Sequence, residues 1–487
     1  MPSRRANGRH PGSVAADRLG PRLVCVGVTA LFIVTGLLYD FRWGSVVRHT
    51  PSLWISPPDL SGIYTSASAV AHGHFGAIYQ SQTAVLTFPG ILFLLAPLGA
   101  LSGHLHTVFV QITENHHPLT YPHYLLSHTP RIWDTGTIAS GAHGANEYAV
   151  QPQWFAVVAP VVIILSCVVL FACDVLAERL KIPPGRRAVL VAAEAVVLWP
   201  VVVIWGHPED ALALALAVFA LFAAMEDRWG WAGWLFGAAV AVQPLVVVVF
   251  PILLVMGGKD RAIGLVVRGV GPAAAVTVGP LVGDAHATIH NVVTQPAYPN
   301  IAGTHQTPWT FLAPKLGGKG ATATVGGGPV RATTLALAVA LGVWARRWRA
   351  RPEMLVWAAA CALALRTYTE SVMTAYYVWP ALAVGLIVAA RGSTWRFAVA
   401  IALAVGTTIM AHQHLDVYPW WIVQVVGVTG LLVAASRPEP LPPDATRGRA
   451  APRASETPAR RKPARAPAGA RDNRPPKAST RRRSVRR

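Results

Sequence analysis

Ionisable side chains stand in a few short stretches between long apolar runs, and the first of them contains Asp59. Asp59 opens the stretch DLSGIYTSASAVAHGHFGAIY, which precedes the apolar run from Phe88. A carboxylate can take a proton from a sugar hydroxyl while that oxygen attacks an activated donor. The alternative is that Asp59 only caps a helix over residues 60–71, since Asp is favoured at that position. Tyr64, one to two turns later, is a candidate substrate contact.

The second stretch is WGHPED, which begins at Trp205 and joins two apolar runs. Its ionisable residues His207, Glu209 and Asp210 are candidates for binding sugar hydroxyls. Acids at the start of a helix are also favourable for a plain electrostatic reason, because the helix N-terminus carries a partial positive charge. Neighbouring His and Glu residues are a weak metal signal on their own, and no metal site is expected from the sequence.

Two further stretches carry candidate binding residues. Asn300, His305 and Gln306 stand in NVVTQPAYPNIAGTHQTPW, where they are suited to a sugar or a phosphate. Arg366 lies inside an apolar segment, where an arginine is costly and indicates a functional site, and its guanidinium suits a phosphate. Glu370 follows one turn later, so an ion pair within one helix is the alternative. Tyr376 is a further candidate for the substrate site.

The composition excludes an ordinary soluble enzyme. Of 487 residues, 53% are hydrophobic and 13% charged, with a mean hydropathy of +0.42. The net charge is +20, but residues 436–487 alone carry +12, so the charge does not indicate a nucleic-acid-binding domain. The four cysteines lie in apolar runs without metal or disulfide spacing.

Apolar segments recur from residue 23 to residue 435, which predicts an all-α polytopic membrane protein. We expect about twelve transmembrane helices in a domain 23–435, between a disordered N-terminus 1–22 and a disordered basic tail 436–487. The tail is suited to anionic lipid, and the alternative is a solvated tail that only fixes the topology. The expected spans are 23–39, 154–174, 188–205, 210–225, 230–243, 244–257, 265–283, 331–346, 354–371, 374–390, 397–411 and 419–435.

Positive charge sets the expected orientation, because cytoplasmic loops are enriched in Lys and Arg. The basic connections between these spans place both termini in the cytoplasm and the regions 40–153 and 284–330 outside. Segment 86–102 is then a re-entrant or interfacial helix in the first outer loop. The alternative lets 86–102 cross and merges 230–257 into one helix.

Three groups of residues resemble the GT-C fold glycosyltransferases, and most closely family 87, the actinobacterial polyprenyl-phosphomannose-dependent mannosyltransferases. The groups are Asp59-Leu60 with Tyr64, Gly73, Ile78-Tyr79, Phe88-Pro89 and Pro97-Leu98; Gly206-His207 with Gln243-Pro244; and Tyr376-Tyr377 with Pro380. The sequence departs from the family pattern at Leu60, where an aromatic residue is usual, at Gln243, where lysine is common, and in the long segment 103–153.

The resemblance implies a plasma-membrane enzyme with an extracytoplasmic active site. It would move a sugar, mannose in the first instance, from a polyprenyl phosphate to a cell-envelope glycolipid or polysaccharide. Asp59 would be the general base, Arg366 and His305 would stabilise the phosphate leaving group, and His207 with Glu209 would shape the sugar site. No cofactor is expected, since the lipid-linked sugar is the substrate. A transporter or flippase for a lipid-linked sugar, and an inactive envelope-assembly scaffold, are the rival hypotheses.

Overall fold

A computed structural model describes the structure of this chain. It covers residues 11–46, 54–55, 58–79, 88–101, 108–112, 132–133, 146–151, 155–289, 297–299, 307–312, 315–318, 321–325, 329–371, 373–413, 415 and 417–440. The chain divides into two compact units, Met1–Thr446 and Arg447–Arg487, and the second lies outside the described residues.

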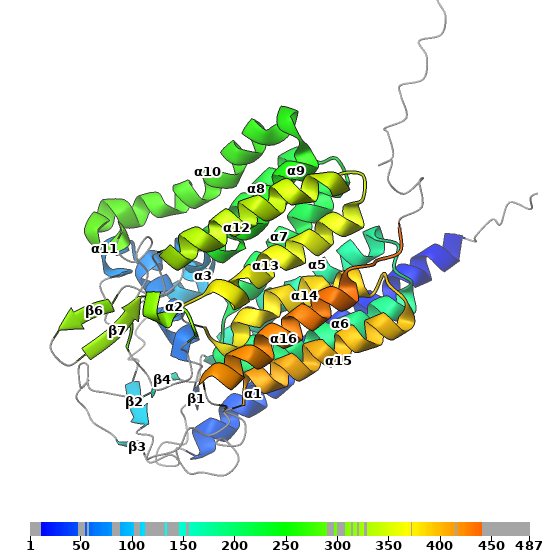
Figure 1. Cartoon of the computed structure of the whole chain (residues 1–487). Coiled ribbons are helices and arrows are strands. Elements are labelled where there is room, and N and C mark those ends of the chain that lie inside the picture. The colour runs from blue at the N-terminus through cyan, green and yellow to red at the C-terminus, as the bar shows by residue number, and fades with distance from the viewer. Residues whose placement is uncertain are drawn as a thin grey trace, which may run out of the picture. The chain divides into compact units, whose positions relative to one another are not determined.

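The first unit is built from helices, most of which lie alongside one another (Figure 1). Proline begins many of them, because its missing N–H costs nothing in the first turn of a helix. The helices are α1 (Pro11–Val46), α2 (Pro58–Ala71), α3 (Pro89–Leu101), α5 (Phe155–Arg179), α6 (Pro184–Trp199), α7 (Pro208–Met225), α8 (Trp229–Val242), α9 (Phe250–Gly257), α10 (Lys259–Gly283), α11 (Ala285–Ile289), α12 (Pro329–Ala345), α13 (Pro352–Thr369), α14 (Trp379–Ala389), α15 (Thr394–Ala411) and α16 (Val417–Ala435).

The expectation of a polytopic helical membrane protein is confirmed. Within the described ranges, seven helices are long and apolar enough to cross a membrane. They are Arg18–Leu38, Val158–Arg179, Pro184–Trp205, Pro208–Met225, Lys259–Gly283, Thr394–Ala411 and Tyr418–Ala435. Four shorter apolar helices accompany them, at Pro89–Ala100, Trp229–Val242, Pro244–Gly257 and Ala375–Ala389. The number of twelve crossings stays a prediction.

The N-terminal prediction needs a correction, because helix α1 begins at Pro11 and not near residue 23. Residues 11–22 are therefore helical. Arg18 and Arg22 form ion pairs with Glu178 of α5, with N–O distances of 2.8 and 3.2 Å. These contacts hold the first turns of α1 against the bundle.

The basic loops meet at one end of the bundle, which we call the basic end. Arginine side chains there bond to backbone carbonyls and acids of neighbouring loops, so that the loops are linked to one another. The contacts join Arg179 to Met225, Arg186 to Ala390 and Gly392, Arg261 to Asp227, Arg349 to Val255, Arg391 to Leu180, and Arg396 to Ala434. The grouping agrees with the single side to which the charge pattern assigned them.

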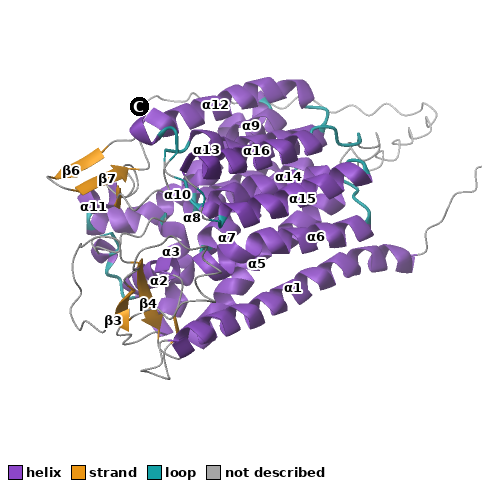
Figure 2. Cartoon of the chain, turned by 60° about the horizontal axis from the view of Figure 1, so that its bottom comes forward, coloured by secondary structure: helices purple, strands orange, loops and turns teal. Residues whose placement is uncertain are grey.

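The opposite end carries α2, α3, α11 and short strands, as both cartoon views show (Figures 1 and 2). The strands are an exception to the all-α expectation. Those described lie in the regions 40–153 and 284–330, which we call the two excursions from the helix bundle. A four-stranded antiparallel sheet has the order β1 (Trp54–Ile55), β4 (Asn146–Gln151), β2 (Val108–Ile112), β3 (Ile132–Trp133). A three-stranded one has the order β5 (Ala297–Pro299), β7 (Ala321–Val325), β6 (Lys315–Gly318).

Helices α2 and α3 pack against each other, and α3 also packs on α8 and α10. Strand β1 follows α1 and pairs with β4, which precedes α5, so the chain between α1 and α5 starts and finishes at the same end. This agrees with the expectation that segment 86–102 makes no crossing of its own. A Cβ atom at Gly90 would collide with the carbonyl oxygen of Ala241, so this glycine permits the close approach of α3 to α8.

The alternative in which 230–257 forms one helix is wrong. Gln243 has extended backbone angles, φ −148° and ψ 109°, which end α8. A 3₁₀ segment, Pro244–Val249, then leads into α9. The ring of Trp229, the first residue of α8, lies close to Gly257, the last residue of α9, so the chain has reversed its direction at Gln243.

Candidate functional site

The turn that carries His207 joins α6 to α7 at the end opposite the basic end. Helix α6 continues into a π-helical segment, Pro200–Trp205, which stops at Gly206. Gly206 has φ +67° and ψ 47°, a left-handed conformation that costs glycine little. Pro208 then begins α7, so His207 is fixed between two helices with Glu209 and Asp210 in the first turn of the second.

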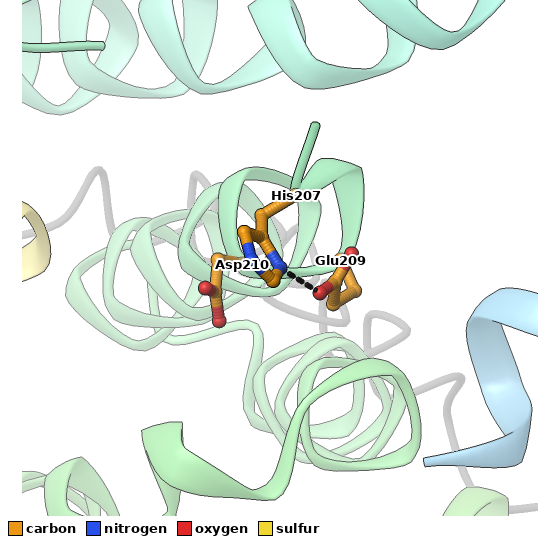
Figure 3. Close-up of side chains that lie close together, drawn as sticks. All are labelled: His207, Glu209 and Asp210. Carbon is orange, nitrogen blue, oxygen red and sulfur yellow. Dashed lines mark hydrogen bonds and ion pairs between the residues drawn. The ribbon is translucent and has the colours of Figure 1, made fainter. Parts of the chain in front are cut away.

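His207, Glu209 and Asp210 form a buried cluster (Figure 3). Glu209 is 1% exposed, and its Oε1 lies 2.5 Å from Nδ1 of His207. The other face of the cluster is set by Gln243, whose Nε2 donates a hydrogen bond of 2.9 Å to Oδ1 of Asp210. The His207 ring packs on Tyr376, with 4.2 Å between ring centroids. Residues far apart in the sequence thus fix one histidine and two acids.

A second buried group surrounds Arg366, at the end of α13. Its Nε donates to Oε2 of Glu370 at 3.3 Å, and its guanidinium carbon lies 3.1 Å from the centroid of the Tyr377 ring. Oε1 of Glu370 also lies 3.9 Å from Nε of Arg331, in α12. The ion pair between Arg366 and Glu370, four residues later, that was the alternative interpretation of Arg366 is therefore present in the structure. The two arginines share this one acid.

A cavity of about 200 Å³ connects these groups. Part of its lining is polar or charged: Asp210, Gln243, Arg331, Thr334, Arg366, Glu370 and Tyr377. The rest is apolar: Phe88, Leu214, Pro244, Leu245, Val246, Val247, Val248, Leu335, Leu363 and Pro380. Such a lining suits a molecule with an anionic head and a hydrocarbon tail, since guanidinium groups bind phosphate and apolar walls exclude water.

The structure brings together five of the residues that the sequence singled out: His207, Glu209, Asp210, Arg366 and Tyr376. For the other five candidates the structure describes no side chain. Asn300, His305 and Gln306 lie outside the described residues, and for Asp59 and Tyr64 only the backbone, in α2, is described. Asp59 lies in the first turn of α2, which begins at Pro58, and not before the helix.

The segment after Gln306 is anchored at the site. Thr307 donates from Oγ1 to the carbonyl of Glu370 at 2.7 Å, and Thr310 does the same to Ser371 at 2.6 Å. Trp309 donates from Nε1 to the carbonyl of Tyr368 at 2.6 Å. The second excursion therefore passes directly over the end of α13.

Sequence reasoning did not select Gln243, Arg331, Tyr377 or Glu370 as site residues, although all four line the cavity. A usable signal existed for Arg331. It stands in the first turn of an apolar helix, far from the basic loops that would explain an arginine. Tyr377 stands in the Tyr376-Tyr377 group that carries the family resemblance, but aromatic residues are also common at membrane interfaces, and only Tyr376 was selected.

His412, at the turn between α15 and α16, is held as a neutral ring. Nδ1 lies 2.7 Å from the carbonyl oxygen of Thr408 and so donates to it, while Nε2 accepts from Nε1 of Trp205 at 3.1 Å. Burial lowers the pKa of His412 below the ordinary 6.5, although the bond to Thr408 opposes this. Trp205 in turn packs on Tyr376, so the turn supports the cluster.

We expect this arrangement to make stability depend on pH. The unfolded chain binds a proton at His412 near pH 6.5, whereas the folded chain binds it only at lower pH. The contribution is therefore complete above the unfolded pKa and is lost as the pH falls through the folded pKa. The fall in melting temperature between about pH 7.5 and about pH 5.5 should be smaller in His412→Asn than in wild type. His72→Asn is the control, because His72 makes the same contact with a carbonyl four residues earlier but is exposed. Equal pH dependence of wild type and His412→Asn would contradict the prediction.

Comparison with protein-family models, with curated proteins and with solved structures finds no match to this chain. The fold and the site therefore define its class without a relative: a polytopic helical membrane protein with a cavity that is lined by both charged and apolar residues.

Proposed function

We propose that this protein is a membrane glycosyltransferase that moves a sugar, mannose in the first instance, from a polyprenyl phosphate to a cell-envelope glycolipid or polysaccharide. The observation that carries the proposal is the mixed lining of the cavity. Arg331 and Arg366 are among its lining residues, and so is the apolar stretch from Pro244 to Val248. A lipid phosphate presents these two chemistries within one molecule.

The reaction would be a single displacement at the anomeric carbon. The acceptor hydroxyl oxygen forms the new bond to this carbon while the bond to the phosphate oxygen breaks. Asp59 takes the hydroxyl proton, and the polyprenyl phosphate leaves with the bonding electrons and one more negative charge. Arg366 and Arg331 would stabilise that charge, which is the part of such catalysis that fixed dipoles and cations supply.

The position of α2 supports the role of Asp59. Helix α2 contacts the π-helical segment just before Gly206. Leu60, next to Asp59, is 5% exposed and belongs to the same buried cluster as Leu212 and Ala213, which follow Asp210 in α7. Helix α2 therefore packs into the same apolar cluster as the part of α7 that follows Asp210. Leu60 supplies an apolar contact at the position where an aromatic residue was expected.

The proposed topology is a GT-C-like fold of twelve spans in the plasma membrane, with the basic end in the cytoplasm. Both termini are then cytoplasmic, and the cavity opens toward the extracytoplasmic side. The arrangement is supported by the common position of the basic loops. The partners in this proposal are the membrane lipid and the two substrates. Nucleic acid is not one of them.

Sugar transfer in membranes tests the proposal. With labelled polyprenyl-phosphomannose as donor and envelope glycolipid extract as acceptor, wild type should transfer sugar, and Asp59→Asn should be slower by about 10²–10⁴-fold. Asp284→Asn is the matched control, since Asp284 accepts a hydrogen bond from the Ala287 N–H in α11 and does not line the cavity.

Three outcomes separate the hypotheses. Equal transfer by wild type and Asp59→Asn removes Asp59 as the base and leaves the transferase. Movement of lipid-linked sugar across liposomes without transfer favours a transporter and overturns the proposal. Absence of both activities with every polyprenyl-phosphate sugar tested leaves the scaffold hypothesis in its place.

A further inference from the structure

One nitrogen and two carboxylate groups converge at the start of α7. His207, Glu209 and Asp210 each offer one ligand atom, and these atoms all lie within 4.8 Å of one another. Three ligands from four consecutive residues are held in place by the left-handed Gly206 before them and the proline-initiated helix after them. We propose that they bind one divalent transition cation, of the series from Mn²⁺ to Zn²⁺.

The donor set decides the class of cation. Imidazole suits transition metals, and carboxylate oxygens suit Mn²⁺ as well as the harder cations, so one His with two acids favours Mn²⁺, Co²⁺ or Zn²⁺ over Ca²⁺. Three protein ligands leave coordination positions open, which is the arrangement of a metal that meets a substrate. Asp210 also lines the cavity, so the open positions would face it.

A buried oxygen without a partner points to a ligand independently. Oε2 of Glu209 is inaccessible to solvent and has no hydrogen-bond partner in the part of the chain that the structure describes. The same holds for Oε1 of Gln243, beside Asp210. Leaving such buried acceptors unsatisfied is unfavourable, and more so for a charged group. A cation at this place would satisfy the acid directly.

The charge at the cavity is compatible with a cation. Among the lining residues, the acids Asp210 and Glu370 balance the guanidinium groups of Arg331 and Arg366 in number. A divalent cation at the cluster would therefore add positive charge beside an anionic substrate. In this respect the inference rests on the proposed function, in which the substrate carries a phosphate.

Binding would need a small rearrangement. Nδ1 of His207 and Oε1 of Glu209 are in hydrogen-bond contact, 2.5 Å apart. Two ligands of one cation stand about 3 Å apart, given bonds of about 2.1 Å. The two side chains would therefore separate slightly to admit the cation.

The test is Mn²⁺ binding by the full chain in detergent, after removal of metals with EDTA, measured from the electron paramagnetic resonance signal of free Mn²⁺. We expect one Mn²⁺ per chain, and a dissociation constant raised about 10-fold or more in Glu209→Gln and in Asp210→Asn. Glu194→Gln is the matched control: Glu194 is also a buried acid with an unpartnered oxygen, but lies in α6 outside the cluster.

Two further measurements keep the inference falsifiable if an acid variant fails to fold. In wild type, pulsed resonance of bound Mn²⁺ should show coupling to a nitrogen nucleus, and His207→Gln should lose it. Gln243→Lys should also weaken Mn²⁺ binding, because it places an ammonium group beside Asp210. Absence of Mn²⁺ binding by wild type, or equal binding by wild type and all cluster variants, would overturn the inference.

This test is separate from that of the proposed function, since no sugar donor is present. Mn²⁺ binding without sugar transfer would keep the metal site and reject the transferase. Transfer that EDTA does not reduce, in a chain that binds no Mn²⁺, would reject the metal site and keep the transferase.

Discussion

Replacing Arg366 by methionine is expected to abolish sugar transfer and to destabilise the folded chain by about 3–5 kcal/mol. The side chain is 13% exposed and bonds to Glu370, whose own side chain is 5% exposed. Without the guanidinium, Glu370 keeps the longer ion pair with Arg331, 3.9 Å, and carries a poorly compensated buried charge. The measurement is the melting temperature in detergent together with transfer per folded molecule.

A double variant separates the two effects. Arg366→Gln with Glu370→Gln removes both charges, and most of the stability should return because the uncompensated buried carboxylate is gone, while Arg331, which loses this acid, is 26% exposed. Transfer should stay about 10²–10³-fold below wild type, because the phosphate contact is still missing. Recovery of transfer along with stability would mean that Arg366 acts only through folding, and the phosphate role would be withdrawn.

The helical part of the fold could be predicted because lipid leaves a chain few choices. Backbone groups in hydrocarbon must bond within their own segment, so each long apolar run forms a helix. Gln243-Pro244 illustrates how a single proline interrupts such a run. Pro244 has no backbone N–H to donate, and the chain reverses its direction at this position. The grouping of the basic loops followed from charge alone.

The excursions were less predictable. Strands β1 and β4 pair across almost a hundred residues, and such pairing depends on contacts that no local pattern records. The start of α1 at Pro11 was missed for a similar reason. Arg18 and Arg22 read as part of a basic, disordered terminus, whereas their partner Glu178 lies on α5.

The candidate site divides in the same way. His207 and Glu209 are two residues apart, and their pairing was visible in the sequence. The contact of Gln243 with Asp210 spans 33 positions, and Arg331 meets Glu370 only because α12 packs beside α13. Contacts between residues that are neighbours in the sequence could thus be predicted. Contacts that depend on the packing of distant helices could not.

A second buried arginine lies at the basic end and provides the comparison that Arg366 needs. Arg187 of α6 is 3% exposed, and Asp174 of α5 is fully buried. Nε and Nη2 of Arg187 each donate a hydrogen bond of 2.7 Å to one carboxylate oxygen of Asp174. Arg22 of α1 stands 3.8 Å from the same carboxylate, so the pair holds three helices together.

Arg187→Met should therefore destabilise the chain by about 3–5 kcal/mol, as much as Arg366→Met, because it leaves Asp174 as a buried charge. Asp174→Leu with Arg187→Met should restore stability, since an apolar pair of similar volume is often neutral or better. The measurements are again melting temperature and transfer per folded molecule.

Transfer by the Arg187 variants should stay near that of wild type, because Arg187 does not line the cavity. Arg187 and Arg366 would then be alike in burial, in having a buried acid as partner, and in the stability lost on replacement. They would differ in the end of the bundle that they occupy and in their effect on transfer. Loss of transfer in both variants would show that turnover follows the integrity of the bundle, and the assignment of chemistry to Arg366 would fail.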